Sequence, residues 1–116
     1  QGKQKYNEKK FDESKFLLQR SIIFDPKDAQ AYLYLAKIYK LEENEKEEEK
    51  NINTVLLLEP KNEEAIYILM EIELKKSNYS KVKKLSEKFV KVCKDLCKKN
   101  QFILKSLKNL EPKNES

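Results

Sequence analysis

The chain has no histidine and only one glycine among its 116 residues. Without histidine it lacks the side chain that most often acts as a general acid or base near neutral pH. A single glycine, Gly2, cannot build a loop that cradles phosphates, and no nucleophile turn of the Gly-x-Ser-x-Gly type is present. These absences predict a protein that is not an enzyme and that uses no cofactor and no catalytic metal.

Helix-breaking residues are also scarce, since three prolines accompany the one glycine. So few breakers leave little room for the turns of a sheet and fit an all-α protein. Charged and apolar residues each make up 39% of the chain. No apolar run approaches the roughly 18 residues of a membrane-spanning helix. We expect an intracellular, cytoplasmic protein, and because the sequence opens within a helical pattern we expect it to be a fragment of a larger one.

The two cysteines, Cys93 and Cys97, are four residues apart in a helical pattern. This spacing predicts that they lie one turn apart on one helical face. A disulfide there would distort the helix, so we expect two unpaired apolar residues in or near a core, in a reducing compartment. Half of a zinc site is the alternative, but a structural zinc needs about four ligands and the chain has no histidine to supply them.

One short segment occurs twice, 34 residues apart. Residues 24–28 read FDPKD, and residues 58–62 read LEPKN. Each copy ends one apolar helical run and precedes the next, and a fixed period of this length indicates stacked pairs of helices. Pro26 and Pro60 are expected in the first turns of the helices they open, where a missing N–H does no harm.

The unit at residues 29–62 resembles a tetratricopeptide repeat, a pair of antiparallel helices with a period of about 34 residues. The positions that carry the resemblance are Tyr32, Leu35, Ala36, Tyr39 and Pro60. The resemblance implies an all-α fold in which helical hairpins stack as a right-handed solenoid.

The neighbouring units match this pattern less fully. In the first unit Gly2 fits the close crossing of two helices, Phe11 is expected at the hairpin turn and Ser14 where the helices approach. In the third unit Glu73 replaces the usual tyrosine and Val82 takes the small position. The predicted organisation is a truncated first repeat at 1–28, a second repeat at 29–62, a third at 63–97 and a C-terminal helical extension at 98–116.

The C-terminal part carries an apolar stripe with a spacing of seven residues. Its members are Val82, Phe89, Leu96, Ile103 and Leu110. Such a stripe favours one long or kinked helix over 79–110, and it offers a surface for self-association. The alternative is a break near 98–100 followed by a short closing helix, in which Phe102, Ile103, Leu104 and Leu107 pack on the third hairpin.

Charge is divided unevenly between the two parts of the chain. Residues 75–116 have a net charge of +9, whereas residues 1–74 have a net charge of −4. A lysine-rich segment is usually a solvated face, but it can also bind an anionic partner. The lysine-rich tail, residues 75–113, therefore leaves a nucleic-acid-binding helical repeat as an alternative function.

The resemblance implies a scaffold whose first helices line a concave groove for a peptide or helix of another protein. The groove-facing candidates are Lys3, Tyr6, Gln30, Leu33, Lys37, Lys40, Tyr67, Glu71 and Lys75. Tyrosines among mixed charges suit a recognition surface. We therefore predict a non-catalytic protein–protein interaction scaffold.

The family members that bind chaperone C-terminal tails hold the terminal carboxylate with lysine, asparagine and arginine side chains. At the matching positions this chain has Lys3, Tyr34, Glu64 and Ile68. None of the four matches, and Glu64 would repel a carboxylate. Chaperone tails are therefore not expected as partners.

Overall fold

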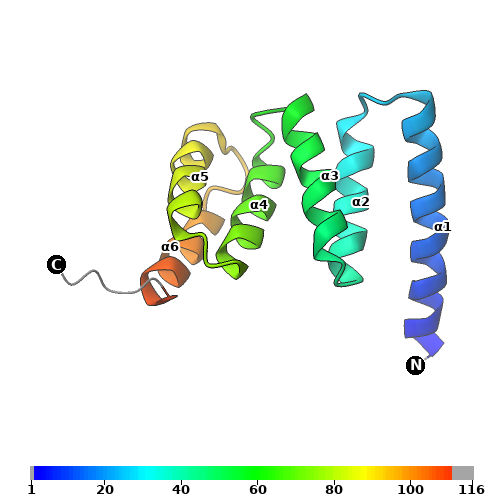
Figure 1. Ribbon diagram of the computed structural model, residues 1–116, viewed down its shortest axis with the longest axis horizontal. Helices are drawn as coiled ribbons and strands as arrows, with labels where there is room; N and C mark the ends of the chain where they lie inside the picture. The colour runs from blue at the N-terminus through cyan, green and yellow to red at the C-terminus, as the bar shows by residue number, and fades with distance from the viewer. Residues whose placement is uncertain (1, 111–116) are drawn as a thin grey trace. The chain divides into compact units, whose positions relative to one another are not determined.

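The computed structural model describes the backbone of residues 2–110 and the side chains of residues 10–110, and this part of the chain is helical without strands (Figure 1). Its helices are α1 (Gly2–Phe24), α2 (Ala29–Leu41), α3 (Glu45–Leu58), α4 (Glu63–Lys75), α5 (Tyr79–Val92) and α6 (Lys99–Leu110). The helical content confirms the all-α prediction. The helices pack mostly as adjacent pairs in chain order. None of the described helices is long and apolar enough to cross a membrane.

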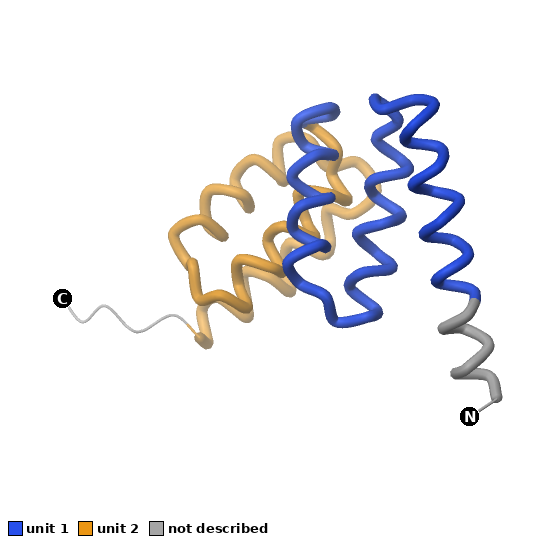
Figure 2. Tube along the Cα trace, turned by 45° about the vertical axis from the view of Figure 1, so that its right-hand side comes forward, with its two compact units in different colours: residues 1–60 blue, residues 61–116 orange. Residues whose placement is uncertain are grey.

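The chain divides into two compact units, residues 1–60 and 61–116, which Figure 2 colours separately. Unit 1 holds α1, α2 and α3, and unit 2 holds α4, α5 and α6. Each unit has its own helix pairs, so each is described by itself.

The same three-residue turn joins α2 to α3 and α4 to α5. Glu43 (φ 60°) and Ser77 (φ 62°) adopt left-handed backbone. The following N–H groups of Asn44 and Asn78 donate to carbonyls five residues earlier, both at 2.9 Å. This pattern closes the C-terminus of a helix. Asn44 is then the N-cap of α3, and Asn78 is the N-cap of α5. Helix starts and turns thus recur after 34 residues in the two units.

The turn that precedes α2 places Pro26 outside the helix. The N–H of Asp28 donates to the carbonyl of Asp25 (3.1 Å), which puts Pro26 at the second position of a β-turn. The side chain of Asp28 then caps α2 by accepting from the N–H of Gln30 at 3.1 Å. Pro60 likewise lies before the cap of α4. The prediction that both prolines occupy first helical turns is therefore wrong, because their fixed φ serves the turn instead.

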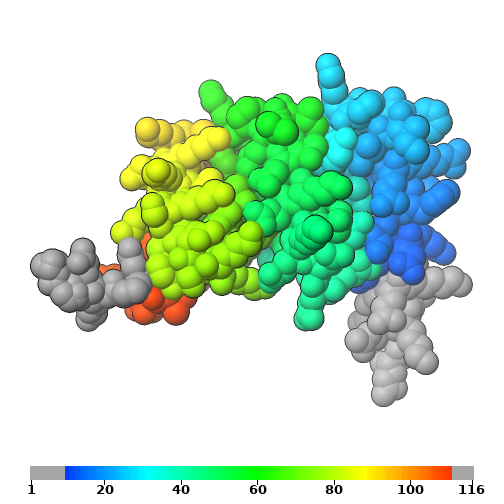
Figure 3. All heavy atoms as spheres, in the orientation of Figure 1, coloured from blue at the N-terminus to red at the C-terminus, as the bar shows by residue number. Residues whose placement is uncertain are grey.

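The core of unit 1 lies between α2 and α3. It is formed by Ala36, Ile52 and Val55, each with no exposed surface, together with Leu35 and Ile38. Ala36 is small enough to let α3 approach closely. On the face shown in Figure 3, side chains fill the space between the ribbons of α1, α2 and α3.

Helix α1 runs without a break through Phe11. The predicted hairpin turn at Phe11 is therefore wrong, since neither glycine nor proline interrupts the helix there. Lys15 ties α1 to the end of α2, with its ammonium 2.8 Å from Glu42 and over the ring of Tyr39 at 5.2 Å. The hydrogen bond to Glu42 raises the pKa of Lys15, and the opposing effect of burial is smaller.

Unit 2 is built on α4, against which α5 and α6 pack. Val82 and Phe89 of α5 and Ile103 and Leu107 of α6 are buried. Inside this core the hydroxyl of Ser86 donates to Oδ1 of Asn100 at 2.7 Å. This bond joins α5 to α6 where both side chains are out of water.

The favoured prediction of one long helix over 79–110 is wrong, because α5 ends at Val92 and α6 begins at Lys99. The alternative, a break followed by a closing helix, is close to the structure. Ile103 and Leu107 are buried as that alternative expects, but Phe102 and Leu104 are 68% and 47% exposed.

The cysteines are paired in the loop between α5 and α6, contrary to the prediction of two unpaired thiols on a helix. Cys93 has extended backbone (φ −66°, ψ 149°), so the chain leaves the helix at this residue. The Cα atoms of Cys93 and Cys97 are then 5.3 Å apart, within the range that a disulfide spans. The helical spacing misled the prediction because the residues between them are not helical.

Candidate functional site

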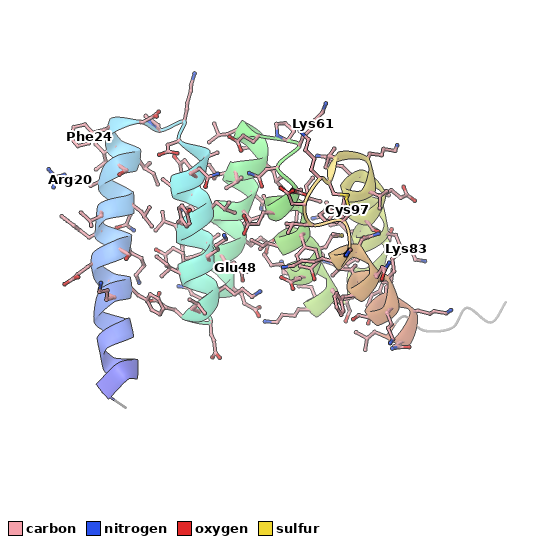
Figure 4. All side chains as sticks on the ribbon, turned by 180° about the vertical axis from the view of Figure 1, so that it is seen from behind. Arg20, Phe24, Glu48, Lys61, Lys83 and Cys97 are labelled. Carbon is pink, nitrogen blue, oxygen red and sulfur yellow. A yellow bond between two sulfur atoms is a disulfide. The ribbon has the colours of Figure 1, made fainter. Side chains whose placement is uncertain are left out.

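Unit 1 exposes an apolar stripe along α1. It consists of Phe16, Leu17, Ile23 and Phe24, which are 57–78% exposed. Positions 16 and 17 lie two turns from 23 and 24, so all four share one side of the helix. Figure 4 shows Arg20 and Phe24 projecting from the side of α1 that faces away from α2. Large exposed apolar patches are typical of interaction sites.

A hollow of about 360 Å³ opens beside this stripe, between α1 and α2. Its walls are formed by Ser14, Leu17, Leu18, Tyr34, Lys37, Ile38 and Leu41. Leu41 and Tyr34 are 65% and 51% exposed, so two large side chains at the hollow meet solvent. The ammonium of Lys37 lies 5.4 Å from the centre of the Tyr34 ring. The hollow is thus mainly apolar, with one cation held against an aromatic ring.

The predicted groove residues on α2 are placed unequally. Lys37 lines the hollow, and Gln30 and Lys40 are exposed. Leu33 is only 2% exposed and offers no open surface. Tyr6, like Lys3, lies in the part of α1 whose side chains are outside the described residues.

The remaining predicted groove residues lie on α4 in unit 2. Glu71 is half-buried and Lys75 is exposed. Tyr67 packs against Phe89 with 5.9 Å between ring centres, and the ammonium of Lys99 lies 5.2 Å from its ring. Burial, and then the charge of Glu71, raises the pKa of Tyr67. Tyr67 therefore contacts α5 and α6 within its own unit. A groove that combines α2 with α4 stays a prediction.

The loop between α5 and α6 binds a carboxylate of α4 through backbone hydrogen bonds. The N–H groups of Lys94, Asp95 and Leu96 all donate to Glu63, at 2.8 to 3.2 Å. Burial acts to raise the pKa of Glu63, but these N–H groups and the charge of Lys94 outweigh it and leave the pKa below its usual value. Three successive N–H groups that converge on one anion form a nest of the kind that binds anions.

A hollow of about 430 Å³ lies beside this nest. It is lined by Lys61, Asn62, Glu63, Glu64, Val92, Lys94, Asp95 and Leu96. The nest was not foreseen from the sequence, since Glu63 and its donors are more than 30 residues apart. The sequence around Glu63 predicts only that this residue lies in the first turn of a helix.

A second carboxylate, Glu73, is buried in unit 2 at 1% exposure. It accepts hydrogen bonds from Nδ2 of Asn78 (2.6 Å) and from Nζ of Lys81 (3.1 Å). Burial acts to raise the pKa of Glu73, but these bonds and the nearby lysine charges lower it on balance. Glu73 thus fastens α5 to the end of α4, at the position where the repeat pattern has tyrosine.

The lysines of the described tail are all exposed. They are Lys75, Lys76, Lys81, Lys83, Lys84, Lys88, Lys91, Lys94, Lys98, Lys99, Lys105 and Lys108. Figure 4 shows Lys83 projecting outward from α5. Only Glu87 and Asp95 supply negative charge between residues 75 and 110.

The apolar stripe of the tail is largely withdrawn from solvent. Val82, Phe89 and Ile103 are buried, whereas Leu110 is 56% exposed. The break between α5 and α6 also interrupts its seven-residue spacing. The stripe therefore does not form one continuous surface for self-association.

Among the described residues, no three histidine, cysteine, aspartate or glutamate side chains gather closely enough to hold a metal ion. The chain matches no protein-family model, and no curated protein matches its sequence.

Proposed function

We propose that this protein is a non-catalytic, tetratricopeptide-like scaffold that binds an amphipathic helix of another protein on unit 1. Support for the repeat assignment comes from the two helical hairpins, whose starts, caps and left-handed turn residues recur after 34 residues. In that arrangement the hairpins stack as a right-handed solenoid.

The observation that carries the proposal is the apolar stripe of α1 beside the α1–α2 hollow. Phe16, Leu17, Ile23 and Phe24 expose apolar surface at helical spacing. A partner helix with apolar residues at the matching spacing covers such a stripe. Large aromatic side chains in the centre of an interface contribute most to affinity.

Charge complementarity refines the description of the partner. Arg20 is exposed between the Phe16–Leu17 pair and the Ile23–Phe24 pair. An acidic residue within the apolar face of the partner would meet its guanidinium, which binds carboxylates through two parallel hydrogen bonds. The partner is therefore an amphipathic helix that carries one carboxylate among its apolar residues.

A displayed library of helix-forming peptides tests this proposal. Selected peptides should carry apolar residues at helical spacing with an acidic residue between them. Their affinity should fall about tenfold or more for Phe24→Ala and for Leu41→Ala, because each truncation removes an exposed anchor. Asn53→Ala, which changes an exposed residue of α3, is the matched control and should bind as the unaltered chain does. Selected peptides that bind all three variants equally well would contradict the proposal.

A second candidate function rests on the exposed lysines of residues 75–108. Such a surface can contact the phosphates of nucleic acid, and binding would weaken steeply with salt. Single-strand stacking has little support, because Phe89 is buried and only Phe102 among the tail phenylalanines is exposed. Absence of binding to generic RNA and DNA at low salt would remove this candidate.

A further inference from the structure

The disulfide between Cys93 and Cys97 encloses the three residues whose N–H groups hold Glu63. Cys97 is exposed and Cys93 is half-buried, so the disulfide lies at the surface of unit 2. Figure 4 shows Cys97 in the loop that precedes α6. We propose that Cys93 and Cys97 form a thiol–disulfide switch that controls the grip of this loop on Glu63.

The disulfide and the nest depend on the same backbone path. Residues 94–96 can direct three N–H groups at one carboxylate only while the loop keeps its curvature. The bond between the flanking cysteines holds both ends of that curve 5.3 Å apart at their Cα atoms. When the bond is broken, the loop gains conformational freedom, and ordering it again opposes the contact with Glu63.

Helix α6 is also held by contacts that lie outside the loop. Helix α6 is held by Ile103 and Leu107, which are 3% and 4% exposed, and by the buried bond between Ser86 and Asn100. Reduction should therefore release the loop while α6 stays docked. The surface that changes is the hollow of about 430 Å³ at the start of α4, whose wall includes residues 94–96.

The chemistry requires a dithiol reductant. Its thiolate attacks Sγ of Cys97, a mixed disulfide forms, and Cys93 leaves as a thiolate that takes up a proton. The second thiol of the reductant then attacks the reductant sulfur that is bonded to Cys97. Cys97 leaves as a thiolate and takes up a proton. Two electrons and two protons pass to the protein, and the reductant becomes a cyclic disulfide.

Equilibration of the folded 116-residue chain with dithiothreitol at fixed ratios of its reduced to its oxidised form tests the switch. Acid quenching, alkylation and mass spectrometry then give the fraction of reduced protein. If reduction breaks the grip on Glu63, then removing Glu63 must favour the reduced form. We expect Glu63→Ala to lower the ratio needed for half-reduction about tenfold, the equivalent of one charge-assisted hydrogen bond.

Two further variants separate this coupling from a general loss of charge or of folding. Glu63→Gln keeps one acceptor oxygen and should shift the ratio by an intermediate amount. Glu87→Ala removes an exposed carboxylate from α5 and should leave the ratio within about twofold of the unaltered chain. The proposal is overturned if Glu63→Ala requires the same ratio as the unaltered chain, or if the disulfide is reduced only in denaturant.

Amide hydrogen exchange gives a second, independent readout. Reduction should speed exchange at Lys94, Asp95 and Leu96, whose N–H groups lose their acceptor, and should leave Ile103 and Leu107 of α6 unchanged. Equal protection of the three loop amides in both redox states would also overturn the proposal.

Discussion

Replacing Glu73 with glutamine removes one negative charge from the interior of unit 2 and hardly changes the size of the side chain. The carboxylate is 1% exposed and accepts from Asn78 at 2.6 Å and from Lys81 at 3.1 Å. Glutamine can still accept from Asn78 through its carbonyl oxygen. Its NH₂ group, however, is a donor that faces the ammonium of Lys81, which is a donor as well.

The expected loss follows from these two bonds. A hydrogen bond to a charged group contributes about 1.5–3 kcal/mol, and a neutral one about 1 kcal/mol. The side chain of Lys81 is 56% exposed, so solvent screens its share of the interaction. We expect Glu73→Gln to lower the free energy of unfolding by about 1–2 kcal/mol. That is a sizeable part of the roughly 5–15 kcal/mol that stabilises a typical domain.

Urea unfolding followed by far-UV circular dichroism measures this loss. With a slope of about 2 kcal/mol per molar urea, the midpoint should fall by about 0.5–1 M. Glu87→Gln makes the same charge change at an exposed position of α5 and should change stability by less than about 0.5 kcal/mol. If the two variants unfold at the same midpoint, the stabilising role assigned to buried Glu73 is refuted.

The stability difference between the unaltered chain and Glu73→Gln should depend on pH. Because the pKa of Glu73 is lowered on folding, the unfolded chain takes up this proton first as the pH falls. The contribution of the ionised carboxylate is complete above its ordinary pKa of 4.5 and is lost as the pH falls through the lower folded value. The stability gap between the unaltered chain and Glu73→Gln should therefore stay constant from about pH 7 to pH 5 and narrow below that. A gap that widens in acid would contradict this sign.

Three further substitutions test the packing of the two units, each by urea unfolding. Phe89→Ala removes a fully buried ring and should cost about 3–5 kcal/mol, whereas Val90→Ala, at a 53% exposed position of the same helix, should cost under about 1 kcal/mol; equal losses would contradict the core assignment. Ser86→Ala leaves Oδ1 of Asn100 buried without its donor and should cost about 1–3 kcal/mol, so no loss would argue against the bond between α5 and α6. Tyr32→Phe removes the 3.0 Å bond to the carbonyl of the turn before α2 and should cost about 0.5–1.5 kcal/mol, and an unchanged midpoint would show that this bond contributes nothing.

The 34-residue spacing predicted that helices begin after residues 24–28 and 58–62, and α2 and α4 do begin there, because local apolar periodicity and turn residues determine these positions. Local signals failed where distant residues decide the structure. The seven-residue apolar spacing continues past Cys93, but the helix ends there. The disulfide from Cys93 to Cys97 begins at this point, and the next residue, Lys94, donates its N–H to Glu63, 31 residues away. Periodicity near the cysteines therefore pointed to a helix that the fold does not contain.

The candidate site was predicted only in part. Lys37 was expected on a binding surface and does line the hollow of unit 1. Tyr67 was also expected on the binding surface. It packs against Phe89 instead, because an aromatic side chain at that position of α4 can reach α5. The exposed stripe of α1 was missed, because the sequence predicted a hairpin turn at Phe11 where the structure has one continuous helix.

An NMR titration shows whether another protein docks on the exposed stripe of α1 and the hollow between α1 and α2. A ¹⁵N-labelled chain is titrated with a peptide selected from the displayed library. We expect the largest changes in chemical shift at the amides of Leu17, Phe24, Tyr34 and Leu41, with little change along α5. Changes concentrated on the lysines of α5 and α6, with unit 1 unaffected, would contradict it.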